Sequence, residues 1–250
     1  MKETETLSQR LDLALVARGL VATRAKARDL IARGEVCVDG EVASKPAMGV
    51  RAAQIIAVDA RAAALVSRGA VKLAAALDHF ELDAKGRVAL DVGASTGGFT
   101  QTLLDHGAAR VYAVDVGKGQ LHPTLAADPR VVALEACDAR RLDRTIVPEP
   151  IRAIVADVSF ISLTKALPAA LGLAAAGCWL VALVKPQFEV GRDGLGKGGI
   201  VRDEALRERA LADVRGWLAE QPGWTVIGTM PSPIEGGSGN AEFLIAAVRS

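Results

Sequence analysis

The chain has 250 residues, half of them apolar and only 4% aromatic, which is enough for one large domain and a small one. Its 30 basic and 29 acidic side chains leave a net charge of +1, so any affinity for RNA must come from a local patch. The three scattered cysteines, Cys37, Cys137 and Cys178, exclude a disulfide framework and a zinc-type spacing, and they favour a reducing cytoplasm.

Two stretches of the sequence are relevant to whether the chain has a signal peptide or a membrane span. The segment before Arg10 is polar and acidic, so we expect no signal peptide. Residues 166–184 carry no charge and just reach the length of a membrane span. Pro168 and Gly172 interrupt them, however, and Ala176-Gly177 is typical of a turn. We therefore expect a packed helix followed by a buried strand at 179–184, and no membrane span.

Residues 8–60 are predicted to form a first unit. Ser8 and Thr23 are candidate caps of two helices, which Gly19 and Gly34 end. Residues 35–42 alternate in polarity and turn at Asp39-Gly40, which is typical of a hairpin. Residues 55–58 give a last short strand. Residues 61–66 are an alanine-rich linker to a second domain that covers 67–250.

Basic side chains gather in the first unit. Between residues 18 and 33 the only acidic side chain is Asp29, and such a patch suits contacts with RNA phosphates, although a solvated helix face has the same composition. The residues that we predict to bind RNA are Arg10, Arg18, Arg24, Lys26, Arg28 and, in the second domain, Arg68.

The order of elements in this unit has a counterpart in a known module. Arg10-Leu11-Asp12, then Thr23-Arg24, then Gly34-x-Val36-x-Val38-Asp39-Gly40 resembles the S-four RNA-binding domain. The resemblance implies that the paired helices and the hairpin loop meet structured RNA.

The second domain alternates apolar strands with helices, which predicts an α/β fold with a mostly parallel, doubly wound sheet. The expected helices cover residues 99–106 and 203–218. The expected strands cover residues 88–92, 111–115, 131–134, 151–156, 179–184, 224–230 and 241–248.

The first of these strands runs into a glycine-rich turn and a new helix. Glycines let the backbone approach a ligand closely, and the helix start offers free N–H groups. The spacing lacks the middle glycine of a dinucleotide fingerprint and the lysine of a phosphate loop. It resembles the first motif of S-adenosylmethionine (SAM) methyltransferases. The predicted cofactor residues here are Asp91, Gly93, Ala94, Ser95, Thr96, Gly97, Gly98 and Phe99.

Charged residues follow the other strands where each one ends, at the edge where such sheets bind ligands. Asp115 can accept the ribose hydroxyls of a nucleoside, and Asp138 can reach an adenine amino group. Val116, Ala139 and Asp157 are expected at the same site. Each carboxylate taken alone could equally be a loop or capping residue.

Lys72, Asp157, Lys185 and Glu242 lie far apart in the sequence but fit the Lys-Asp-Lys-Glu tetrad of the FtsJ-like ribose 2′-O-methyltransferases. The surrounding phrases at 67–73, 157–162, 184–189 and 198–203 are similar to the TlyA family of rRNA methyltransferases, long labelled haemolysins. The resemblance implies a Rossmann-like seven-stranded sheet whose last strand is antiparallel. It also implies SAM as cofactor, ribosomal RNA or ribosomal subunits as partner, and a cytidine as target.

Several alternatives stay open. Lys185 is the candidate nearest the reacting hydroxyl, either as general base or as stabiliser of the developing alkoxide, while Lys72 and Glu242 orient the ribose and Lys185. Residues 189–199 are either a lid or a surface connection. Lys2 is followed by Glu3 and Glu5, and the absence of a basic run before Arg10 favours the large ribosomal subunit. No metal site is expected, and the sequence does not indicate an oligomeric state.

Three other function classes compete with this interpretation. A nicotinamide-dependent dehydrogenase would share the sheet, but the glycine spacing disfavours it. A non-catalytic RNA-binding module would leave the tetrad without a role. A pore-forming haemolysin is suggested only by the older family label, and the alternating pattern of strands and helices offers it no spanning segment.

Overall fold

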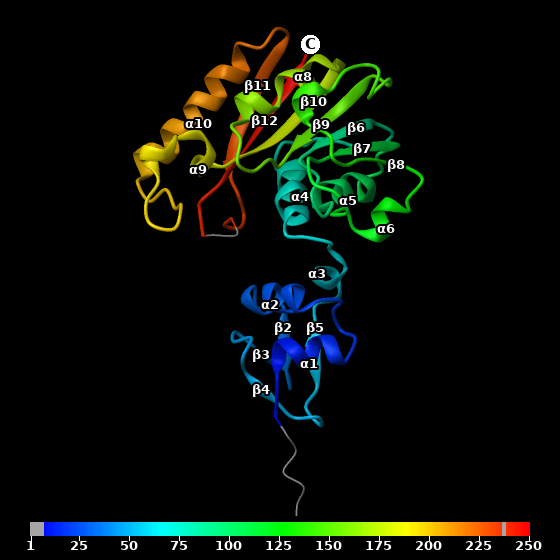
Figure 1. Cartoon of the computed structure of the whole chain (residues 1–250), viewed down its shortest axis with the longest axis vertical. Coiled ribbons are helices and arrows are strands. Elements are labelled where there is room, and N and C mark those ends of the chain that lie inside the picture. The colour runs from blue at the N-terminus through cyan, green and yellow to red at the C-terminus, as the bar shows by residue number, and fades with distance from the viewer. Residues whose placement is uncertain (1–7, 237–238) are drawn as a thin grey trace, which may run out of the picture. The chain divides into compact units, whose positions relative to one another are not determined.

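The computed structural model describes residues 8–236 and 239–250, which divide into two compact units (Figure 1). The first unit ends at Leu65 and the second begins at Val66. Lys2, Glu3 and Glu5, on which the expectation of a large-subunit substrate rests, lie outside the described residues.

The first unit packs two helices against short strands. The helices are α1 (Leu11–Ala17) and α2 (Arg24–Ala32), and their apolar faces form a core with the central strand β2. One sheet holds β2 (Val36–Val38) between β3 (Glu41–Val42) and β5 (Ile56–Val58); in another, β1 (Gln9–Arg10) pairs with β4 (Gly49–Val50).

Local sequence signals explain most of these elements. Thr23 caps α2 as predicted, because its hydroxyl accepts the N–H of Lys26 at 3.2 Å. Asp39 and Gly40 both have positive φ, as a two-residue hairpin turn of type I′ requires. The predicted cap of α1 is wrong: Arg10, not Ser8, precedes the helix, because the chain there pairs as strand β1.

The second unit is built on a seven-stranded sheet in the order β11-β12-β10-β9-β6-β7-β8. In this sheet β12 alone runs in the opposite direction to the other strands, which confirms the predicted sheet. Its strands are β6 (Val88–Val92), β7 (Arg110–Val114), β8 (Val131–Leu134), β9 (Ile151–Ala156), β10 (Ala174–Val184), β11 (Trp224–Pro231) and β12 (Phe243–Arg249).

Helices cover both faces of this sheet (Figure 1). One face packs against α4 (Gly69–His79), α5 (Gly98–Asp105) and α6 (Pro123–Ala126) through residues such as Leu73, Phe99 and Leu125. The other packs against α7 (Leu163–Ala166), α8 (Pro168–Gly172) and α10 (Glu204–Ala219) through residues such as Leu167 and Leu218. The sheet therefore lies between two buried cores.

Three short helices lie outside these layers: α3 (Ala60–Ala64), α9 (Pro186–Glu189) and a 3₁₀ turn, η2 (Arg192–Gly194). A second 3₁₀ turn, η1 (Ala139–Arg141), follows β8. The expected linker is thus partly helical.

The uncharged stretch at 166–184 folds as the end of α7, then α8, then β10. The predicted turn at Ala176-Gly177 is instead an irregularity inside β10, where Gly177 has φ of 73° and the pairing with β9 shifts between Ala174 and Trp179. Within residues 8–236 and 239–250, none of the helices combines the length and the apolar character that crossing a bilayer demands.

Candidate active site

The glycine turn connects β6 to α5 and shapes the centre of the carboxyl edge. Gly93 has φ of 85°, and a Cβ there would lie 2.7 Å from the carbonyl oxygen of Asp157, at the end of β9. Gly97, with φ of 97°, stands at the N-cap of α5. The turn can follow this path only because these positions lack side chains.

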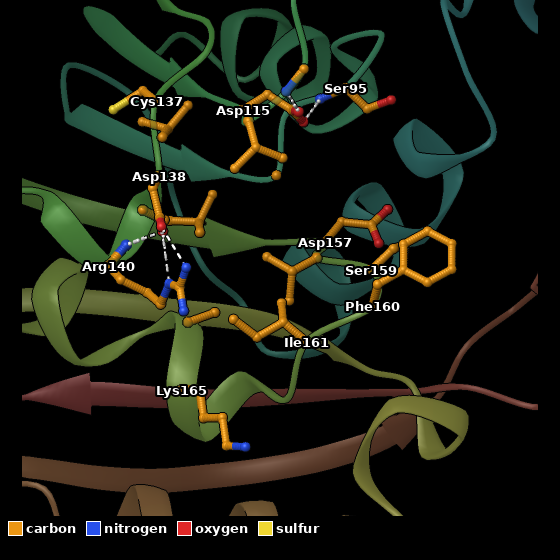
Figure 2. A pocket seen from close by; sticks show the side chains of 18 of the residues that line it. Ser95, Asp115, Cys137, Asp138, Arg140, Asp157, Ser159, Phe160, Ile161 and Lys165 are labelled. Carbon is orange, nitrogen blue, oxygen red and sulfur yellow. Dashed lines mark hydrogen bonds and ion pairs between the residues drawn. The ribbon is translucent and has the colours of Figure 1, made fainter. Parts of the chain in front are cut away.

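A cavity of about 760 Å³ opens beside this turn, at the ends of β6, β7, β8 and β9 (Figure 2). Seven predicted cofactor residues line it: Gly93, Ser95, Asp115, Val116, Asp138, Ala139 and Asp157. The sequence interpretation missed other lining residues, among them Gln120, Cys137, Arg140, Ser159, Phe160, Ile161 and Lys165. Ser159, Phe160 and Ile161 belong to the 157–162 phrase noted in the sequence but were not assigned to the site. Arg140 and Lys165 lie in η1 and α7.

Asp115 is held in place by the backbone. Its two carboxylate oxygens accept the N–H groups of Ser95 at 2.8 Å and of Gly117 at 2.7 Å, and Figure 2 shows it facing Ser95. Each oxygen keeps further acceptor capacity, which suits a pair of vicinal hydroxyls. The neighbouring Val116 is an exposed apolar side chain on the cavity wall.

Asp138 has a partner that the sequence did not indicate. Arg140 donates its Nε and Nη2 groups and its backbone N–H to the Asp138 carboxylate, at 2.6–3.0 Å (Figure 2). The side-chain hydrogen bond from Arg140 lowers the pKa of Asp138 to about 2. An ionised, paired carboxylate therefore forms this wall of the cavity.

Two predicted residues of the glycine turn do not line either cavity found at this edge. Asp91 is fully buried in β6, where its Oδ2 accepts the Thr100 hydroxyl at 2.7 Å. Burial raises the pKa of Asp91 to about 7. A Cβ on Gly97 would collide with Leu121 and Leu125. Asp91 and Gly97 therefore stabilise the turn without forming part of a cavity wall.

The four tetrad residues form two ion pairs. Lys72 Nζ on α4 lies 2.5 Å from Glu242 Oε2, which directly precedes β12, and both side chains are buried. Lys185 Nζ, after β10, lies 2.6 Å from Asp157 Oδ1 and donates to Ser159 Oγ at 2.9 Å.

The two pairs meet next to the glycine turn. Lys72 and Asp157 line one smaller cavity of about 220 Å³, together with Gly93, Arg68 and the other turn residues Ala94, Ser95, Thr96, Gly98 and Phe99. The β10–β12 pairing of Val184 with Phe243 sets Lys185 and Glu242 at the next opposing positions. Sheet topology thus gathers four charged groups that are distant in sequence.

A buried asparagine fixes the loops around the Lys72–Glu242 pair. Asn240 Oδ1 accepts the N–H of Val201 at 3.0 Å, and its Nδ2 donates to the carbonyl of Gly199 at 3.1 Å. A Cβ on Gly236 would press against the Glu242 carboxylate. The end of residues 189–199, which were expected to form either a lid or a surface connection, is therefore tied to the segment just before β12, a contact the sequence interpretation missed.

Most of the predicted RNA-binding residues of the first unit have partners within that unit. Arg10 and Arg24 both donate to Asp12, which is fully buried. Arg18 donates to the carbonyls of Arg51 and Gln54. Lys26 donates to the carbonyl of Leu65, while Arg28 is exposed on α2. Arg10 and Arg24 remain about half exposed, so their outer nitrogens face solvent.

Comparisons with known proteins match both units. The FtsJ-like methyltransferase family matches residues 65–249, and the S4 domain matches residues 9–56. A relative from Mycobacterium tuberculosis, named 16S/23S rRNA (cytidine-2′-O)-methyltransferase TlyA, is 48% identical over 94% of this chain and 88% of its own length.

Two further relatives carry another name. Hemolysin A of Brachyspira hyodysenteriae is 39% identical over 94% of this chain and 98% of its own length. A solved structure described as a hemolysin from Streptococcus thermophilus has 38% identity and a TM-score of 0.75, covering 98% of this chain and 90% of that one. The chain therefore belongs to the FtsJ-like methyltransferase family, in its TlyA branch, and is a methyltransferase with an S4 domain.

Proposed function

We propose that the chain transfers a methyl group from SAM to the ribose 2′-hydroxyl of a cytidine in ribosomal RNA. The observation that carries the proposal is the convergence of two lysine–carboxylate pairs beside the glycine turn. The name of the relative that is 48% identical supports the same reaction. We further propose the cytoplasm as the site of action, because ribosomal RNA is found there.

The large cavity suits the nucleoside part of SAM. Asp115 offers acceptors for both ribose hydroxyls, and the exposed Val116 offers an apolar surface for the adenine ring. Asp157 and Asp115 provide negative charge that favours a cationic ligand. When bound, SAM would supply a methyl group activated by its positively charged sulfur.

Lys185 and Asp157 are the proposed catalytic pair. The contact with the Asp157 carboxylate favours a charged ammonium on Lys185, which then stabilises the negative charge that develops on the 2′-oxygen. The oxygen–carbon bond forms as the sulfur–carbon bond breaks, and the hydroxyl proton passes to water. If Lys185 is instead uncharged, it takes that proton itself as a general base.

Lys72 and Glu242 are proposed to orient the ribose. Because the pair is buried, each charged group needs the other as its partner, and this holds the two side chains in place. Lys72 shares the smaller cavity with Asp157, which sets it beside the reacting group. Correct alignment of oxygen and methyl contributes several kcal/mol to such reactions.

The S4 domain is proposed to deliver the RNA, and Arg68 to meet it near the smaller cavity. The name of the relative that is 48% identical covers 16S and 23S rRNA, so we propose ribosomal RNA of the large subunit, the small subunit or both as the substrate.

Three variants test the catalytic assignment. Lys185→Ala should abolish methyl transfer while leaving affinities for RNA and SAM nearly unchanged, and Lys185→Arg, which keeps the charge, should retain measurable transfer if Lys185 acts as a cation. Lys85→Ala is the matched control, because Lys85 is an exposed lysine at the amino end of β6. Normal methylation by Lys185→Ala would contradict the assignment.

A further inference from the structure

The loop between β7 and α6 folds over a single carboxylate. Glu135 Oε2 accepts the N–H of Gly119 at 2.8 Å, and its Oε1 accepts those of Gln120 at 2.8 Å and Leu121 at 3.2 Å. These backbone bonds lower the pKa of Glu135. Three successive N–H groups aimed at one carboxylate fix the backbone at residues 119–121.

Both sides of this loop are anchored. Ala136, in the left-handed region with φ of 53°, donates its N–H to the carbonyl of Gly117 at 2.8 Å, and Cys137 donates to the carbonyl of Asp115 at 2.9 Å. At the far end, the N–H of His122 reaches the carbonyl of Thr96 in the glycine turn at 3.2 Å. A strained residue next to Glu135 indicates that the surrounding structure enforces this path.

Gln120 is the side chain that the anchored loop brings to the cavity. It lines the large cavity together with Asp115, and its Oε1 lies 3.4 Å from Ser95 Oγ. Its carboxamide carries both donors and an acceptor, which suits hydroxyl groups of a nucleoside. Asp115 offers acceptors alone, so the two side chains are complementary.

We propose that Gln120 contacts the nucleoside part of the cofactor and that Glu135 is the residue that positions it. This inference rests on the proposed use of SAM. Glu135 does not line either cavity, so its effect on binding passes through the loop that it holds. Gln120 lies outside the glycine motif, and Glu135, which directly follows β8, was not among the predicted site residues.

A double-mutant cycle on the full chain tests the proposal, with the dissociation constant of SAM measured by calorimetry. Gln120→Ala removes one or two hydrogen bonds, and Glu135→Ala releases the loop, so each should weaken binding about tenfold. Because Glu135 acts through Gln120, the double variant should bind about as weakly as Glu135→Ala rather than about a hundredfold more weakly than wild type.

Two further variants separate positioning from general damage. Glu135→Gln keeps one amide oxygen for the loop and should give an intermediate affinity. Glu208 is an exposed glutamate on α10, so Glu208→Gln is the matched control and should bind SAM like the wild type. Affinity for RNA and the midpoint of urea unfolding should be the same in all variants; a misfolded second unit would lower the midpoint.

Two results would overturn the inference: wild-type affinity in Gln120→Ala, or a double variant whose loss equals the product of the single losses. If Glu135→Ala does not fold, Gln120→Ala combined with Glu135→Gln completes the same cycle. Failure of the wild-type protein itself to bind SAM would instead overturn the proposed function, and this inference with it.

Discussion

Asp91 combines complete burial with an ionisable group. Its Oδ2 accepts the Thr100 hydroxyl, and among the described residues its Oδ1 has no hydrogen-bond partner. Burial raises its pKa to about 7, and the nearby Asp157 carboxylate adds to the effect. The acid therefore joins strand to helix at the glycine turn, where a charge is costly.

The raised pKa has a definite sign for stability. The folded protein holds a proton on Asp91 up to about pH 7, while the unfolded chain loses it near pH 4, so this group's contribution to stability falls as pH rises between those values. Asp91→Asn stays neutral and can still accept from Thr100. Urea unfolding should show the variant gaining stability relative to wild type from pH 5 to pH 8; an unchanged difference would contradict the assignment.

The positions of site residues could be predicted only where topology decides them. Asp115, Asp157 and Lys185 were found because parallel strands end at one edge, so position in the chain gives position in space. The partners Arg140 and Ser159 were missed because local loop geometry brings them in. The tetrad itself came from family resemblance, since nothing in the spacing pairs Lys72 with Glu242.

Among the elements, the turn from β6 to α5 depends most on the absence of side chains. A Cβ on Gly93 would meet the backbone of Asp157 and Val158, which cannot move without disturbing the end of β9. Gly86 also has positive φ, of 70°, but nothing lies within 4 Å of a Cβ placed there. A side chain at Gly93 would therefore cause both a steric contact and backbone strain, whereas a side chain at Gly86 would cause backbone strain alone.

Gly93→Ala should weaken SAM binding at least tenfold, because the turn must shift away from β9 to admit the methyl group. Gly86→Ala should cost about 1–2 kcal/mol of unfolding free energy, from its left-handed backbone alone, and leave SAM affinity unchanged. Calorimetric titration of both variants checks this. Equal losses of affinity would show that the contact with Asp157 is not what matters.

The ends of helices and strands could likewise be predicted only where neighbouring residues determine them. The Asp39-Gly40 hairpin and the Thr23 cap were predictable because the turn and the cap are made by neighbouring residues. The predicted helix cap at Ser8 and the predicted turn at Gly177 were wrong because pairing with the distant strands β4 and β9 overrides the local signal.

At the scale of the whole molecule, the two units carry different chemistry. The basic helix α2 lies in the first unit, and the tetrad and the cofactor cavity lie in the second. With a net charge of +1, the chain as a whole attracts RNA only weakly, so we propose that the arginines of the first unit supply the electrostatic attraction.

Replacing Arg24 and Arg28 together by Ala should weaken RNA binding and reduce the slope of log affinity against log salt by about 2, one for each lost phosphate contact. SAM affinity should not change. Arg18→Ala is the comparison, because Arg18 is bonded to the carbonyls of Arg51 and Gln54 and should alter stability more than the salt slope. An unchanged slope in the double variant would exclude phosphate contacts by Arg24 and Arg28.

The measurement that tests the central claim most directly is methyl transfer from labelled SAM to ribosomal subunits and to free ribosomal RNA, followed by digestion to nucleosides. We expect label in 2′-O-methylcytidine from at least one ribosomal subunit, and none with the Lys185→Ala protein. Label on a base, or transfer that survives the loss of Lys185, would contradict it.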